Sequence, residues 1–208
     1  MLQSDDASSV ASQFSKTFFS KTRNMLVRIA VWHYFVLEGV FVGFFSSFLP
    51  QMQITLGLTD SMLGSAVIFY YTGQVLAAPI AGAIIRNHGC RVACFTGSMC
   101  FCIALPFVSL ADTYDLLCGT FLCFGLSLGL IDVSMNSAAI LAEVIAAKPI
   151  VGAFHGSYSV SVALGGLAGT ALSKNFTALQ VYTTLSCIFG FLNVFAGYIL
   201  YVIVRGYV

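Results

Sequence analysis

The sequence predicts an all-α membrane protein built as a bundle of six transmembrane helices. Hydrophobic residues make up 59% of the chain and charged residues 8%, against roughly 45–50% and about 25% in soluble domains. A soluble domain of this composition would lack the polar residues needed to cover its surface. Several windows of about 20 residues carry one charge or none, and this is the length that a helix needs to cross a bilayer.

The predicted spans follow a polar N-terminal segment. Residues 1–24 are expected to form a disordered cytoplasmic tail rather than a cleavable signal peptide, because their apolar residues are scattered among Ser, Thr and Lys. The bundle then occupies 25–208, with spans at about 26–49, 61–85, 92–111, 116–139, 152–173 and 180–204. The connections are short, which predicts that consecutive helices pack as neighbours. Pro149 is expected to mark the entry to the fifth span.

Basic residues predict the orientation of the bundle. With the N-terminus inside, eight of the nine basic residues fall on the cytoplasmic side and only Lys174 falls outside. Both termini are then cytoplasmic, as an even number of spans requires. The expected location is a plasma or inner membrane, with the lipid bilayer as the surrounding partner.

Several classes of function have no support in the sequence. The seven cysteines lie almost wholly inside the predicted spans, and none forms a Cys-x-x-Cys pair with histidines at zinc spacing, so we read them as structural thiols. We find no nucleophile–base pair and no metal cluster, and therefore expect no enzyme activity, no metal and no cofactor. No basic patch or aromatic platform indicates nucleic acid.

Two carboxylates inside the predicted spans are the main candidates for function. Glu38 lies midway along the first span, and Asp132 lies past the middle of the fourth. Each is the only carboxylate well inside its group of three spans, which suggests a weak 3+3 internal repeat. A carboxylate in a membrane normally faces a bundle interior or a wet cavity. With no lysine or arginine deep in any span, proton handling is the functional interpretation, and a hydrogen-bonded structural role is the alternative.

Three further residues are candidate members of a solute or proton site. Asn136 lies one turn beyond Asp132, where it could orient the carboxylate, bind a polar ligand by a hydrogen bond, or join two helices by a hydrogen bond. His155 opens the fifth span, where it could relay protons, cap the loop or pack against the fourth span. Gln74 is the only amide of the second span, and with Tyr70 and Tyr71 it is a cavity candidate or part of ordinary aromatic packing.

Glycines predict where helices approach each other closely. Gly125, Gly129, Asp132 and Asn136 share one helical face at i, i+4, i+7 and i+11. The pair Gly125-x-x-x-Gly129 and a second pair, Gly165-x-x-x-Gly169, are typical of close helix packing. We expect the face that ends in Asp132 and Asn136 to be an interface or a cavity wall.

Two stretches resemble a known family of transporters. The short loop after the second span places Gly82, Gly89 and Arg91 in the spacing G-x-x-x-D-x-x-G-x-R, the signature loop of the major facilitator superfamily, with Arg86 at the acidic position. The run from Gly129 to Asn136, followed by Phe154-His155-Gly156 and a Gly-Gly-x-x-Gly helix, resembles the fucose-permease-like branch of that superfamily. The resemblance covers about residues 30–175.

This resemblance implies a fold and an activity. It implies the N-terminal six-helix half of a twelve-span fold, and transport of a sugar-like solute with protons as the coupling ion (symport). Asp132 matches the acidic position of the fourth helix, and Asn136 matches the asparagine one turn on. The midplane cavity of such a transporter lies between two halves, so a homodimer or a second transporter half is an expected partner.

Two hypotheses therefore remain open from the sequence. In the first, the chain transports a small polar, sugar-like solute with protons, when complete or paired with a second half. In the second, it is a truncated, non-transporting membrane protein that associates with or regulates a partner. Solute uptake in proteoliposomes distinguishes them.

Overall fold

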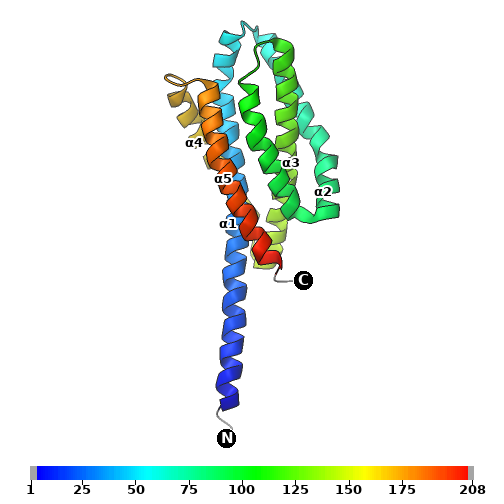
Figure 1. The fold of residues 1–208 in the computed structure, drawn as a ribbon, viewed down its shortest axis with the longest axis vertical. Helices are drawn as coiled ribbons and strands as arrows, with labels where there is room; N and C mark the ends of the chain where they lie inside the picture. The colour runs from blue at the N-terminus through cyan, green and yellow to red at the C-terminus, as the bar shows by residue number, and fades with distance from the viewer. Residues whose placement is uncertain (1–3, 206–208) are drawn as a thin grey trace.

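The computed structural model describes the backbone of residues 4–205 and the side chains of residues 24–198. Five helices follow one another along the chain: α1 (Ser4–Thr55), α2 (Asp60–Val108), α3 (Tyr114–Ala146), α4 (Val151–Leu172) and α5 (Ala178–Arg205). No strand occurs within residues 4–205. The prediction of an all-α fold is confirmed, although the elements number five where six separate helices were expected (Figure 1).

Helix α1 is longer at both ends than the predicted first span. It begins at Ser4, so that the backbone of 4–24 is helical where a disordered tail was expected. No glycine or proline interrupts the sequence between Ser4 and Glu38, and acidic Asp5 and Asp6 lie near the N-terminal end of the helix dipole. Figure 1 shows this first stretch extending alone beyond the bundle. The helix also continues through Pro50 to Thr55, because a proline removes only one hydrogen bond of the helical ladder.

Helix α2 contains both the second and the third predicted span. It leaves helical geometry at Gly89, which has φ 83° and ψ 161°. Tyr70 and Phe101 would lie more than about 45 Å apart in a straight helix, yet both rings stack on Phe124 of α3, at centroid distances of 5.7 Å and 4.9 Å. The two arms of α2 therefore run back along each other from Gly89 (Figure 1).

Replacing Gly89 by alanine is expected to lower stability, because a positive φ places the Cβ of an L-residue against its own backbone. The expected loss is about 1–2 kcal/mol, measured as a lower midpoint of thermal denaturation in detergent. Gly82 is the matched control, since it lies in the regular helix of the same element and a Cβ there meets nothing within 4 Å. Equal midpoints for the two variants would contradict the prediction.

The boundaries of the other helices follow local capping. The Thr59 hydroxyl accepts a hydrogen bond from the Met62 amide at 3.2 Å, and Thr113 caps α3 in the same way through Leu116 at 3.3 Å. Helix α3 runs to Ala146, past the predicted end at 139, and stops where Ala147 adopts a left-handed conformation. No glycine or proline occurs between Asn136 and Pro149 to end it sooner.

Glycines determine which helices pack together. A Cβ at Gly125 would overlap the Tyr70 carbonyl oxygen of α2, and one at Gly165 would lie 2.6 Å from the Val40 carbonyl oxygen of α1. The predicted close packing at Gly125/Gly129 and at Gly165/Gly169 is therefore confirmed. Helix α4 packs mainly on α1 and makes few contacts with α3 or α5, and α1 makes few contacts with α2, so the expectation that consecutive helices are neighbours was wrong for these three pairs. The reason is that the glycine face of α4 complements that of α1.

Four helices in the described part of the chain are long and apolar enough to span a membrane, namely Asn24–Thr55, Asp60–Val108, Tyr114–Ala146 and Ala178–Tyr198. Large apolar side chains point outward from all sides of the bundle, including Val75 (72% exposed), Val144 (71%), Leu167 (71%) and Phe191 (75%). Such a surface matches hydrocarbon and not water. Small and polar residues lower the hydropathy of α4, which is the shortest of the helices.

Candidate functional site

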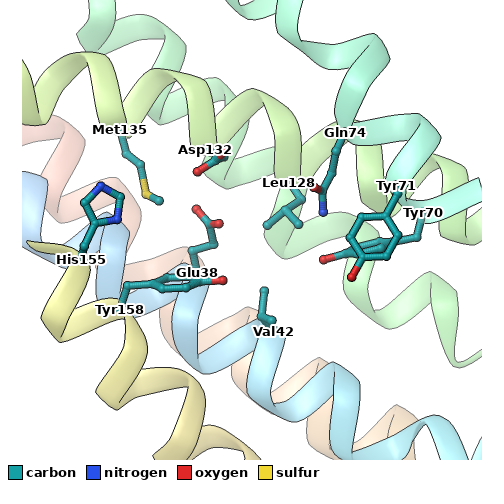
Figure 2. Close-up of a pocket in the computed structure, with 10 residues that line it drawn as sticks. All are labelled: Glu38, Val42, Tyr70, Tyr71, Gln74, Leu128, Asp132, Met135, His155 and Tyr158. Atoms are coloured by element: carbon teal, nitrogen blue, oxygen red, sulfur yellow. The ribbon is translucent and has the colours of Figure 1, made fainter. Parts of the chain in front are cut away.

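A polar pocket of about 270 Å³ lies among α1, α2, α3 and α4 (Figure 2). Its walls combine two carboxyl groups, three phenols, an amide and an imidazole with a few apolar side chains. Its lining residues are Glu38, Val42, Tyr70, Tyr71, Gln74, Leu128, Asp132, Met135, His155 and Tyr158. No lysine or arginine is among these described lining residues.

Glu38 enters the pocket from α1. Its side chain is only 4% exposed, and its Oε2 atom has no hydrogen-bond partner among the described residues. Figure 2 shows its carboxyl group pointing toward that of Asp132 on α3. A buried carboxyl oxygen without a partner is costly. A proton on this oxygen, or a hydrogen bond to it from a water or a solute, would remove that cost.

Asp132 faces Glu38 from the exposed side of α3. Its Oδ1 accepts a hydrogen bond of 2.9 Å from Asn136 Nδ2, which also donates to the Asp132 carbonyl oxygen at 2.9 Å. Asn136 does not line the pocket. Both of these hydrogen bonds run to Asp132 of the same helix, as the predicted role of Asn136 in orienting the carboxylate requires.

His155 and Gln74 complete the set of residues that the sequence singled out. His155 lies in the second turn of α4, its ring edge against Phe35 at a centroid distance of 5.2 Å, and within electrostatic range of Asp132. Gln74 extends from α2 into the pocket beside Tyr70 and Tyr71 (Figure 2). The pocket is thus lined by four of the five candidate residues, Glu38, Gln74, Asp132 and His155. The fifth, Asn136, is hydrogen-bonded to Asp132.

The structure adds side chains that the sequence did not select for the site. Tyr158 lies one turn after His155, Val42 one turn after Glu38, and Leu128 and Met135 flank Asp132. Helical spacing could have identified them, because residues at i−4, i+3 and i+4 share the face of a candidate. Val42, Leu128 and Met135 are apolar and carry no chemical signal of their own, and this is why the sequence did not point to them.

The glycine face of α3 divides into two parts. Gly125 and Gly129 are closed against Tyr70 and Gln74 of α2, whose backbones lie within contact distance of a Cβ at either position. Asp132 continues the same face into the pocket. The expectation of an interface or a cavity wall therefore holds for this face, with the interface at one end and the cavity at the other.

Comparisons with known proteins point to membrane transporters. Over 135 residues, or 65% of its length, the chain is 30% identical to an uncharacterized MFS-type transporter of Yersinia pestis, of which it covers 34%. Over 148 residues it is 26% identical to an uncharacterized transporter of Sinorhizobium fredii, of which it covers 39%. No protein-family model matches the chain.

The chain therefore spans between a third and two-fifths of the length of these curated relatives. The similarities support a relationship to transporters of the major facilitator superfamily (MFS). Together with the four helices that are long and apolar enough to span a membrane, they support an integral membrane protein.

Proposed function

We propose that the chain forms the N-terminal six-span half of a major facilitator fold and, when paired with a second half, moves a small, polar, sugar-like solute together with protons. The observation that carries the proposal is the pair of facing carboxyl groups, Glu38 and Asp132, in a pocket without a lysine or arginine. Two like charges that face each other are unfavourable in a low-dielectric site. When one of the two carboxyl groups takes up a proton, that repulsion is relieved. Protonation of the pair and binding of a solute in the pocket therefore become coupled.

Six crossings are consistent with the arrangement of the helices. The two arms of α2 reverse at Gly89 and count as two crossings. Helix α4 has 22 residues and is about 33 Å long, which is enough for a hydrocarbon core of about 30 Å. Helix α1 enters and α5 leaves at the same end of the bundle (Figure 1). The excess of basic residues at that end supports a cytoplasmic location for both termini.

The lining of the pocket favours a neutral hydroxyl-bearing solute over an anion. Carboxyl, phenol, amide and imidazole groups exchange hydrogen bonds with hydroxyl groups in either direction. An anionic solute would meet two carboxyl groups and no lysine or arginine. The volume of about 270 Å³ lies just below the usual range of small-molecule sites, which begins at about 300 Å³.

The test is uptake by purified protein in proteoliposomes, with a panel of neutral and acidic monosaccharides and an imposed proton gradient. We expect uptake of a neutral sugar that a protonophore abolishes. Uptake that the protonophore does not change would refute proton coupling, but it would not refute transport.

A chain that transports nothing in this assay would favour the second hypothesis, a non-transporting protein that associates with a partner. Asp132 lies on the exposed side of the pocket, where a second copy or a second transporter half would cover it. Mass measurement in native-like membranes reports on this directly. A transport-competent monomer would overturn the proposed pairing.

A further inference from the structure

A second cavity, of about 280 Å³, lies between α1 and α4, near the loop between α3 and α4. It is separate from the polar pocket and shares no lining residue with it. Its lining residues are Arg28, Ile29, Trp32, Ile150, Ala153 and Phe154. One wall is therefore cationic and the others are apolar or aromatic.

Arg28 is incompletely paired in this cavity. Its Nε atom is buried and has no hydrogen-bond partner among the described residues. A buried N–H without an acceptor is unfavourable, and more so on a charged group. An acceptor from outside the chain would remove this cost, and an oxygen of a phosphate group suits the fork of an arginine.

The surface around Arg28 is exposed and apolar. Met25, Ile29 and Trp32 are 54%, 52% and 49% exposed, and they share one face of α1 at i, i+4 and i+7. Tryptophan is enriched where the headgroups of a bilayer meet its hydrocarbon. A ligand of the cavity therefore has to satisfy a cation at one end and apolar walls at the other, as a phospholipid does.

Glu143 is hydrogen-bonded to a residue that lines this cavity, but its acceptor oxygen is used by backbone amides. The Oε2 atom of Glu143 accepts hydrogen bonds from the Ile150 amide at 2.7 Å and the Val151 amide at 2.8 Å. The negative charge of Glu143 therefore compensates the positive end of the helix dipole at the N-terminus of α4. Exposed Lys148 lies two residues before Ile150 and adds a further positive charge nearby.

We propose that this cavity is a binding site for an anionic phospholipid. Arg28 donates to the phosphodiester, and the upper part of an acyl chain lies against Ile29, Trp32 and Phe154. The positive charges of Arg28 and Lys148 favour an anionic over a zwitterionic headgroup. The apolar walls favour a lipid over a soluble phosphate. The proposal is independent of which solute, if any, occupies the polar pocket.

Trp32 provides a local probe, because it is the only tryptophan of the chain. We would reconstitute the protein in vesicles that mix plain phosphatidylcholine with brominated phosphatidylglycerol, and in the reverse mixture, and measure the quenching of Trp32 fluorescence. We expect a preference for phosphatidylglycerol of about fivefold, since one basic side chain at a membrane surface contributes about 1 kcal/mol. Arg28→Gln should bring the preference close to one, and Arg28→Lys should retain part of it.

Arg86→Gln is the matched control, because Arg86 is an exposed arginine that does not line the cavity. This variant should keep the wild-type preference. The wild-type measurement tests the proposal even if Arg28→Gln fails to fold: equal quenching by the two lipids would overturn it. So would an unchanged preference in Arg28→Gln, or displacement of the brominated lipid by soluble glycerol phosphate.

Discussion

Gly125→Leu is expected to prevent the bundle from assembling, so that little monodisperse protein is recovered in detergent. A Cβ at this position would overlap the backbone carbonyl oxygen of Tyr70 on α2, and that oxygen cannot rotate away as a side chain could. The two helices would have to separate along their whole glycine contact. Overpacking of a tight interior costs about 1–3 kcal/mol, and more where backbone is displaced.

Alanine substitutions separate packing from helix propensity. Gly→Ala in a regular helix is worth about 1 kcal/mol of stabilisation where space allows. Gly119 lies on the same helix, α3, is exposed, and a Cβ there meets nothing within 4 Å. We therefore expect Gly119→Ala to raise the midpoint of thermal denaturation and Gly125→Ala to lower it. A midpoint that rises in both variants would show that α2 and α3 are less tightly packed than described.

Asp132→Asn is expected to uncouple solute uptake from the proton gradient, on the function proposed above. The amide keeps the shape of the side chain but cannot take up or release a proton. Hydrogen bonds to charged groups contribute about 1.5–3 kcal/mol, so gradient-driven uptake should fall by about ten- to a hundredfold. The measurement is initial uptake in proteoliposomes with and without an inward proton gradient.

Glu38→Gln extends this experiment to the facing carboxyl group. If the two groups act as a pair, either substitution removes the repulsion that a proton relieves, and the double variant should be no worse than the worse single one. Asp112→Asn makes the same chemical change at an exposed position in the loop between α2 and α3 and should leave uptake unchanged. A wild-type response to the gradient in Asp132→Asn would refute the role proposed for this residue.

The sequence by itself determined the class of fold and most of the candidate site. Composition requires a bilayer around the helices, because so few polar residues cannot cover a soluble surface. A carboxylate within an apolar helix is costly wherever the helix goes, so Glu38 and Asp132 could be selected without knowledge of any contact. The glycine spacing of α3 gave the face that carries Asp132, because helical periodicity is a local property of the chain.

Only the tertiary structure decided which candidates meet. Glu38 and Asp132 are 94 positions apart, and they meet because α1 packs against α3, where the ring of Phe45 contacts the rings of Phe121 and Phe124. The pairing of α1 with α4 and the packing of both arms of α2 on α3 are long-range outcomes that no window of the sequence contains. The same is true of Arg28, which reads in the sequence as one more basic residue near a membrane boundary. The Nε atom of Arg28 is buried without a partner where residues of α4 line the same cavity. Burial of this kind is a property of the packed bundle.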